Sequence, residues 1–345
     1  MDSLHNKTDK RVLKQQLRST PQNRLTLSFY KYHQISDPHE FRNSLYKTLT
    51  AIGVLGRIYV ANEGINAQIS IEKDGVDLFK ETLDKIDFLK NVRLNIAIED
   101  DGKSFFILKV QVKKKIVADG LDDKGFDVTN SGIHVNAVEF NKLTNDPETV
   151  IVDIRNHYES EVGHFENAVI PDVDTFKSSL PIVEKILEDK KDKNILMYCT
   201  GGIRCEKASA WLKHRGFKNV FQLEGGIIEY TRQVKEHGEE NKFIGKNFVF
   251  DERLGERISD TIISVCHQCG KPCDTHTNCT NEGCHLLFIQ CNECAEKFNG
   301  CCSIECKEIL ALTPVEQREL RKGKVQGQMI YKKGRSKNIK FTTKS

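Results

Sequence analysis

The chain has 345 residues, enough for two or three domains that each bury a core of their own. Its 52 Lys and Arg nearly balance its 49 Asp and Glu, leaving a formal net charge of +3. No apolar run approaches the roughly 20 residues of a membrane-spanning helix, and the polar N-terminus lacks the apolar core of a secretory signal. We therefore expect a cytoplasmic protein in which disulfides are rare and clustered cysteines are metal ligands.

After a polar extension (1–24), residues 25–125 are expected to form an α+β domain. Strand patterns are expected at 25–29, 56–60, 67–71, 92–98 and 105–112, with helices starting at 37 and near 76. The order β-α-β-β-α-β, which the last two strand patterns close together, predicts a ferredoxin-like sandwich. Many small domains with this plan bind nucleic acid, but the fold alone does not assign a function.

Residues 132–240 are expected to form an α/β domain with a parallel sheet, and its centre is a loop that starts at Cys199. The loop lies between an apolar run (195–198) and a helical pattern (205–214). A strand, a glycine-rich turn and a helix in this order direct backbone N–H groups and the positive helix end at the loop. We therefore expect Cys199 to be a thiolate nucleophile with a lowered pKa. The other residues of this anion-binding loop are Thr200, Gly201, Gly202, Ile203 and Arg204.

This loop resembles the active-site loop of rhodanese (sulfurtransferase) domains. It is one residue shorter than the loop of the related dual-specificity phosphatases, and the short loop suits a persulfide better than a whole phosphate. The strand that ends in Asp153 and Arg155, the Gly-His pair at 163–164 and the Gly-Gly turn at 225–226 also resemble this domain. We expect Asp153 and Arg155 to form an ion pair that braces the loop and takes no part in the chemistry.

Cys205 follows Cys199 by six positions at the start of the expected helix. One interpretation is that it resolves an oxidised Cys199 by forming a disulfide. The other, which we prefer, is that it caps the loop or packs against it.

Residues 241–312 are expected to form a cysteine-rich zinc module. Ten of the twelve cysteines lie between positions 266 and 306, eight of them in close pairs. The pairs are Cys266 and Cys269, Cys279 and Cys284, Cys291 and Cys294, and Cys302 and Cys306. Structural zinc takes four soft ligands, and a segment this poor in apolar residues has little core of its own. We predict two zinc ions, one shared by the first and third pairs and one by the second and fourth.

Alternatives remain open within this module. Cys273 and Cys301 are left over, and either could replace a neighbouring ligand. The nearby histidines could compete as ligands as well. These are His267, His276 and His285. A redox role of the Cys-x-x-Cys pairs is the alternative to metal binding.

The last segment (313–345) is expected to be a basic tail. From position 318 onward it holds ten Lys or Arg and one Glu, a net charge of +9 against −6 for the rest of the chain. Such a tail is either a solvated end or a segment that lies along a phosphate backbone.

Taken together, the chain resembles the rhodanese-like tRNA uridine hydroxylase family over nearly its whole length. The resemblance rests on the strings LSFYKY (27–32), NEGINAQIS (62–70), YCTGGIRCEKAS (198–209) and FIGKNFVFD (243–251), together with the cysteine cluster. It implies hydroxylation of the wobble uridine of certain tRNAs at C5, with molecular oxygen as co-substrate and Cys199 as the catalytic residue. It also implies tRNA as the partner, with no role for DNA or membranes.

The residues themselves support only part of this activity. They predict a reactive sulfur and surfaces for an anionic partner. The sequence contains no Gly-rich nucleotide fingerprint and no recognisable flavin, haem or iron site. Either the thiolate adds to C6 of uridine and enriches C5 in electrons, or a persulfide or oxidised sulfur on Cys199 reacts directly. The alternative function is a plain sulfurtransferase that uses a donor such as thiosulfate. A third interpretation, a non-enzymatic RNA-binding adaptor, is disfavoured because it would need neither Cys199 nor Arg204.

Overall fold

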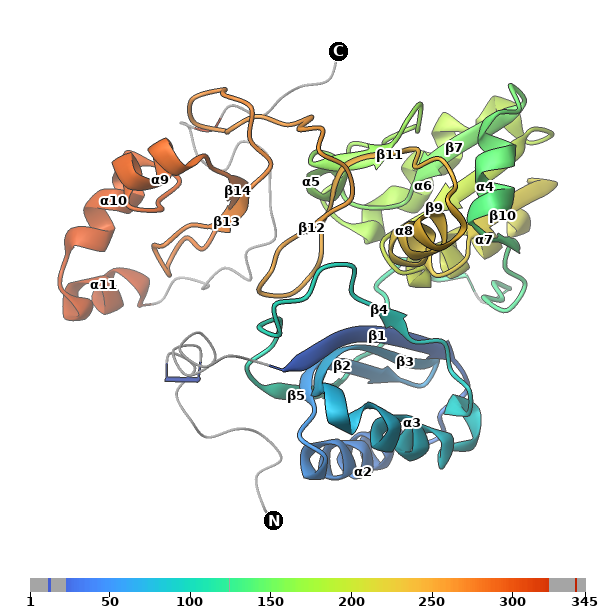
Figure 1. Cartoon of the computed structure of the whole chain (residues 1–345), viewed down its shortest axis with the longest axis horizontal. Coiled ribbons are helices and arrows are strands. Elements are labelled where there is room, and N and C mark those ends of the chain that lie inside the picture. The colour runs from blue at the N-terminus through green and yellow to red at the C-terminus, as the bar shows by residue number, and fades with distance from the viewer. Residues whose placement is uncertain (1–11, 14–22, 124, 323–338, 340–345) are drawn as a thin grey trace. The chain divides into compact units, whose positions relative to one another are not determined.

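The computed structural model describes residues 12–13, 23–123, 125–322 and 339 (Figure 1). The expected N-terminal extension and basic tail lie largely outside these described residues. The chain divides into two compact units. The first contains the chain up to Arg155, Phe176–Asn241 and Val249–Arg253, and the second contains Asn156–Thr175, Lys242–Phe248 and the chain from Leu254 onward.

The first unit begins with a five-stranded sheet in the order β4-β1-β3-β2-β5. Its strands are β1 (Arg24–Tyr32), β2 (Leu55–Ala61), β3 (Gly64–Glu72), β4 (Asn95–Ile96) and β5 (Leu108–Val112). Helices α2 (Pro38–Ala51) and α3 (Val76–Asp84) cover one face of this sheet (Figure 1). The four strands from β4 to β2 are antiparallel, and β5 adds a parallel edge beside β2. This arrangement confirms the predicted α+β sandwich.

Alternation along β1 separates its two faces. Leu27 and Phe29 are buried in the core beneath the helices, whereas the intervening polar residues belong to the opposite face. Asp37 caps α2, because its carboxylate accepts hydrogen bonds from the backbone N–H groups of His39 and Glu40, each at 2.9 Å. The expected helix start at this position is therefore confirmed.

The fourth strand is shorter than the sequence pattern predicts. A strand is expected over 92–98, but only Asn95–Ile96 pair with β1, and the ladder ends after Ala97 N–H donates to Thr26 O at 3.0 Å. From there the carboxylate of Asp100 accepts hydrogen bonds from the Thr26 backbone and side chain. A side chain thus replaces the ladder, and β5 starts only at Leu108.

A second sheet in the first unit has the order β6-β10-β9-β7, with all its strands parallel. The strands are β6 (Ile133–Val135), β7 (Thr149–Asp153), β9 (Asn194–Tyr198) and β10 (Asn219–Leu223). Helices α6 (Phe176–Ile186) and α7 (Ile203–His214) pack with the buried side chains of β7, β9 and β10. Helices α4 (Ala137–Thr144) and α8 (Gly226–His237) contact each other through Phe140 and Tyr230, whose ring centroids are 5.6 Å apart. The predicted parallel α/β domain is confirmed.

The second unit holds the cysteine-rich segment and some chain from the expected α/β domain, including the Gly-His pair at 163–164. Its two small antiparallel sheets have the orders β12-β11-β8 and β13-β14. The strands are β8 (Gly163–Phe165), β11 (Phe243–Asn247), β12 (Glu256–Arg257), β13 (His276–Asn278) and β14 (Leu287–Ile289). The helices are α5 (His157–Ser160), α9 (Asn292–Phe298), α10 (Ile304–Ala311) and α11 (Pro314–Arg321). None of the helices in the described part of the chain has the length and apolar character to cross a bilayer.

Candidate active site and metal centres

Cys199 follows directly after β9, and its side chain is fully buried. The backbone N–H of Gly202 donates to Cys199 Sγ at 3.2 Å, and α7 begins at the next residue. Gly202 has φ = +97°, a conformation that residues with a side chain rarely adopt. The glycine therefore allows the chain to fold back so that its amide faces the sulfur.

The surroundings of Cys199 favour its thiolate. Burial by itself would raise the pKa of Cys199, but a hydrogen bond from the Cys205 thiol, the charge of Arg204 and the N–H groups of Cys205 and Gly202 lower it to about 6. Burial and the hydrogen bond to Cys199 raise the pKa of Cys205 well above its usual value. Cys199 is thus the ionised member of the pair near neutral pH, and Cys205 is its hydrogen-bond donor.

Arg204 lies in the first turn of α7 and is mostly buried, and its charge acts on Cys199. Its Nη2 donates to Thr200 Oγ1 at 3.2 Å, and its guanidinium carbon lies 5.7 Å from the centroid of the Phe250 ring. The cation therefore stays within the first unit near the sulfur, where it attracts negative charge.

The opposite side of the loop is held by the start of α8. The backbone N–H of Ile227 donates to Cys199 O at 3.0 Å, and that of Ile228 donates to Thr200 O at 3.2 Å. Gly226 has φ = +66°, and a Cβ there would lie 2.5 Å from Cys199 O. Glycine at 226 is therefore what allows α8 to approach the loop this closely.

Asp153 and Arg155 form a fully buried ion pair, with Nη2 of Arg155 2.7 Å from Oδ2 of Asp153. The hydroxyl of Tyr198 donates to the same carboxylate oxygen at 2.8 Å, and the Arg155 guanidinium lies 5.6 Å from the Tyr198 ring centroid. The pair thus joins the end of β7 to the residue that precedes Cys199. These contacts fit the bracing role expected for Asp153 and Arg155.

The first sheet supplies contacts to the loop that the sequence analysis missed. Tyr30 OH donates to Glu206 Oε1 at 3.0 Å, Tyr32 OH to Ile203 O at 3.3 Å, and Asn95 Nδ2 to Gly201 O at 3.2 Å. The sequence analysis ended this strand at residue 29, whereas β1 continues to Tyr32, and alternation places both tyrosines on its polar face. The partners lie 106 to 176 positions away in sequence.

A buried lysine on α7 adds a second link. Lys207 Nζ lies 2.6 Å from Asp119 Oδ2 and 2.9 Å from Glu63 Oε1, and Lys207 and Asp119 are each 1% exposed. It also donates to Val117 O at 3.0 Å. Helix α7 is therefore joined to the first sheet and to the connecting segment by fully paired charges.

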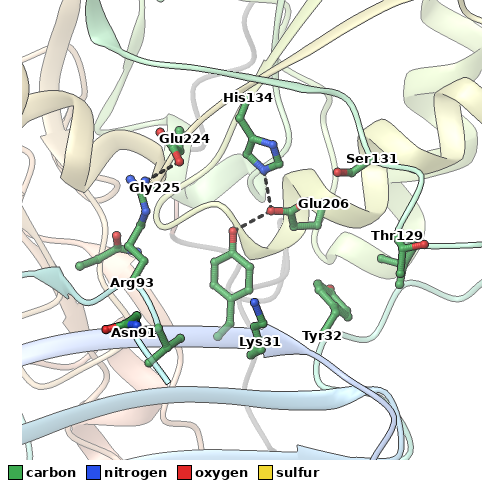
Figure 2. Close-up of a pocket in the computed structure, with 14 residues that line it drawn as sticks. Lys31, Tyr32, Asn91, Arg93, Thr129, Ser131, His134, Glu206, Glu224 and Gly225 are labelled. Carbon is green, nitrogen blue, oxygen red and sulfur yellow. Dashed lines mark hydrogen bonds and ion pairs between the residues drawn. The ribbon is translucent and has the colours of Figure 1, made fainter. Parts of the chain in front are cut away.

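A cavity of about 300 Å³ lies beside the loop in the first unit (Figure 2). Residues of β1, of the segment 91–95, of the connection 128–131, of β6 and of α7 line it, together with the turn after β10. Among the described residues, the lining includes Glu206 and Gly225 but not Cys199. The cavity is therefore a neighbour of the nucleophile and not its immediate surroundings.

The second unit gathers eight cysteines into two groups of four, and within each group all sulfur atoms lie within 4.8 Å of one another. One group is Cys266, Cys269, Cys291 and Cys294, and the other is Cys279, Cys284, Cys302 and Cys306. The Sγ–Sγ distances are 3.6 Å for Cys269 and Cys291, 3.6 Å for Cys284 and Cys302, and 3.8 Å for Cys302 and Cys306. A tetrahedron of sulfurs about 2.3 Å from a zinc ion has edges of about 3.8 Å. The structure thus brings together the first and third pairs, and the second and fourth.

Backbone amides complete these two groups. The N–H of Cys291 donates to Cys266 Sγ and the N–H of Cys302 to Cys279 Sγ, each at 3.4 Å. Such bonds orient and stabilise thiolates around a metal ion. The remaining cysteines, Cys273 and Cys301, are buried in the same unit, but neither belongs to a group. The nearby histidines stand outside the groups as well.

Three family models match successive parts of the chain. They are described as a UPF0176 acylphosphatase-like domain at residues 24–116, a rhodanese-like domain at 136–233 and a rhodanese C-terminal domain at 244–307. The first two fall on the two sheets of the first unit. The third spans all the cysteines of the two groups.

Curated relatives match the chain over almost its whole length. A protein of Photorhabdus laumondii is 55% identical over 336 residues, which cover 97% of this chain and 96% of the relative. Proteins of Escherichia fergusonii and of an Enterobacter species are 55% and 54% identical over 338 residues, which cover 98% of this chain and 97% of each relative. All three relatives are named tRNA uridine(34) hydroxylase.

Proposed function

This chain belongs to the tRNA uridine(34) hydroxylase family, and we propose that it hydroxylates the wobble uridine of tRNA with Cys199 as its catalytic residue. The observation that carries the role of Cys199 is its loop. The buried sulfur of Cys199 has a pKa of about 6, accepts hydrogen bonds from backbone N–H groups and lies close to the charge of Arg204. Such a thiolate is a nucleophile near neutral pH, and the remaining loop residues, Thr200, Gly201, Gly202 and Ile203, hold it.

Molecular oxygen is the oxidant of this proposal. Insertion of one oxygen atom into a C–H bond consumes two electrons and two protons, because the second oxygen atom leaves as water. Closure of a thiolate and a thiol to a disulfide supplies both electrons and one proton, and solvent supplies the second proton. Cys199, as the thiolate, and Cys205, as the thiol, share a hydrogen bond in the loop. We therefore propose the resolving role for Cys205 in place of the packing role preferred from the sequence. The overall reaction then converts uridine, oxygen, one thiolate, one thiol and a proton into hydroxyuridine, water and one disulfide.

The relatives that match this chain over almost their whole length are named hydroxylases. This supports hydroxylation over the alternative of a plain sulfurtransferase. The contacts of the first sheet with the loop support it as well. A sulfurtransferase that carries sulfur between small molecules needs the loop and little else, whereas Tyr30, Tyr32 and Asn95 extend the surface around it. We expect tRNA, a large polyanion of the cytoplasm, to occupy this extended surface.

The test is nucleoside mass spectrometry of tRNA from cells that lack the gene, complemented with the wild type or with Cys199→Ala. We expect a hydroxylated wobble uridine and its derivatives to disappear without the gene and to return only with the wild type. Full restoration by Cys199→Ala would remove Cys199 from the reaction. Unchanged nucleosides in the deletion strain would make sulfur transfer the leading function.

We further propose that each group of four cysteines binds one zinc ion with a structural role. Four sulfurs at tetrahedral spacing leave no open position for water or substrate, so no catalytic step involves these ions. Elemental analysis of the purified protein should find two zinc ions per chain. Cys302→Ser should lower this to one and destabilise the second unit, whereas Cys301→Ser, at a buried cysteine outside both groups, should keep two. Two ions in Cys302→Ser would show that this residue is no ligand.

A further inference from the structure

The cavity beside the catalytic loop is built from three stretches of chain that are distant in sequence. The first sheet supplies β1 and residues 91–95, the connecting segment supplies residues 128–131, and the second sheet supplies β6, α7 and the turn after β10. Its volume of about 300 Å³ is at the lower end of the range for small-ligand sites. A rhodanese-like domain alone would lack half of these walls.

Asn95 contributes an unusual acceptor to the cavity wall. The residue is 2% exposed, and its Nδ2 donates to Gly201 O at 3.2 Å, which identifies Oδ1 as the other amide atom. Among the described residues, no group donates a hydrogen bond to Oδ1. A buried acceptor without a donor costs about 1–3 kcal/mol, so this oxygen is suited to accept a hydrogen bond from a ligand.

Gly225, also in the cavity lining, lies beside this oxygen. A Cβ at Gly225 would stand 3.2 Å from Asn95 Oδ1. Any side chain there would therefore crowd the oxygen. Oδ1 is shielded from solvent, so a ligand reaches it only with a small movement of the cavity wall.

Three basic side chains, Lys31, Arg93 and His134, also line the cavity, together with the carboxylates of Glu206 and Glu224 (Figure 2). Lys31 is exposed, and within the described chain no carboxylate lies within ion-pair distance of it. Arg93 pairs with Glu224, and its guanidinium has further N–H groups to donate. The Nε2 atom of His134 lies 2.9 Å from Glu206 Oε1, which orients the ring. The cavity therefore combines one unfilled acceptor with the cation of Lys31. Its other basic side chains, Arg93 and His134, are paired with Glu224 and Glu206 of the same wall.

Uracil has the complementary pattern. Its N3–H is a donor flanked by two carbonyl acceptors, and in RNA the base carries a ribose and a phosphate. Cytosine has no proton on N3, so its ring nitrogen would face the Asn95 oxygen as a second acceptor. Among the pyrimidines, uracil therefore satisfies the lone acceptor, and Lys31 is a cation that the phosphate of a uridine nucleotide can pair with.

We propose that this cavity binds the target uridine of the tRNA, with Asn95 Oδ1 accepting a hydrogen bond from N3–H of the base. The inference rests on the proposed function, because the uridine substrate comes from it. Asn95 is then a specificity-determining residue. Its Nδ2 contacts Gly201 in the catalytic loop, so one side chain contacts both the base and the loop.

The experiment measures binding of an anticodon stem–loop RNA that carries either uridine or 3-methyluridine at position 34. The methyl group removes the N3 proton and leaves both carbonyls in place. We expect the wild type to bind the methylated RNA about 5- to 150-fold more weakly, the range that corresponds to one unsatisfied buried polar group. Asn95→Ala should bind the two RNAs equally, because it has no acceptor to leave unsatisfied.

Two variants complete the design. Asn95→Asp retains a side-chain oxygen but loses the Nδ2 donor to Gly201, so it should still prefer unmethylated RNA even if the loop is perturbed. Asn43→Ala, an exposed asparagine on α2 outside the cavity, should retain the wild-type ratio. Equal binding of both RNAs by the wild type, or an undiminished preference in Asn95→Ala, would overturn the proposal.

The outcome is independent of turnover. Hydroxylation of tRNA is measured separately with the wild type, and its absence would count against the proposed function without affecting the binding ratio. Conversely, if the wild type hydroxylates tRNA but binds both RNAs equally, the proposed function stands and the proposed uracil pocket is wrong.

Discussion

Cys199 owes its reactivity to neighbours from two elements. The Gly202 amide and Arg204 come from the start of α7, Cys205 from the same turn, and the amides of α8 hold the loop carbonyls from the opposite side. Burial works against ionisation, so the hydrogen bonds and the nearby cation must outweigh it. The charge of this sulfur therefore reports on the geometry of the whole loop.

The first prediction concerns the pH dependence of this sulfur. The pKa of Cys199 is about 6 against an ordinary value of 9.0, so the thiolate should predominate above pH 6 and the thiol below it. The difference in thiolate absorbance at 240 nm between the wild type and Cys199→Ala should rise with a midpoint near pH 6. A midpoint near pH 9 would mean that the loop does not stabilise the anion.

A second prediction separates the two roles of Cys205. Cys205→Ala removes the donor to Cys199 and should raise the pKa of Cys199, whereas Cys205→Ser keeps an O–H donor and should leave it low. Both variants lack the second sulfur, so neither can form a disulfide. If Cys205 supplies electrons, both should lose multiple-turnover hydroxylation. Normal turnover by Cys205→Ser would mean that Cys205 has only a packing role.

At the scale of elements, the approach of α8 to the loop depends on one glycine. A Cβ at Gly226 would lie 2.5 Å from Cys199 O and 2.6 Å from Thr200 O. We expect Gly226→Ala to displace the loop and raise the pKa of Cys199, with a loss of stability above the roughly 1 kcal/mol of a positive-φ alanine. Absorbance titration and denaturant unfolding measure the two effects.

The matched control lies at the other end of the same helix. Gly238 has φ = +68°, close to the +66° of Gly226, but a Cβ there would meet no atom within 4 Å. Gly238→Ala therefore has the same backbone penalty without the clash, and it should leave the Cys199 titration unchanged. Similar titrations for the two alanine variants would show that the close contact at Gly226 does not position the sulfur.

The elements that sequence predicts well are those specified by nearby residues. The Cys199 loop, the Asp37 cap and the cysteine pairs depend on spacings of a few positions, so their patterns are visible in the chain. The length of β4 depends instead on Asp100, whose carboxylate ends the pairing with β1. A carboxylate that replaces a strand ladder has no periodic signature, so the expected strand at 92–98 was too long.

The site residues that could not be found from the sequence depend on distant contacts. Tyr30, Asn95 and His134 act through partners more than 70 positions away. The expected strand at 25–29 stops before Tyr30, and a single sequence does not show which loop the polar face of that strand meets. Distant contacts of this kind require the fold, whereas the catalytic loop is recognisable without it.

At the scale of the whole molecule, we propose that the first sheet extends the sulfur site of the rhodanese-like domain into a site for a larger substrate. The first sheet contacts the loop through its polar face, and Lys207 joins that sheet to α7 through buried charges. Breaking a buried pair by removing one partner costs about 3–5 kcal/mol. Residues from both parts of the first unit line the same cavity.

The last prediction concerns the basic tail, whose charge is known from sequence alone. Residues 323–345 hold seven Lys or Arg and no acidic residue. If they lie along the tRNA backbone, their deletion should weaken tRNA binding and make log K less steep against log salt, by about 0.7–0.9 for each phosphate that the tail neutralises. The Cys199 titration should be unchanged, because the loop lies in the first unit. An unchanged salt slope would identify the tail as a solvated end, and an altered titration would show that the deletion perturbs more than tRNA binding.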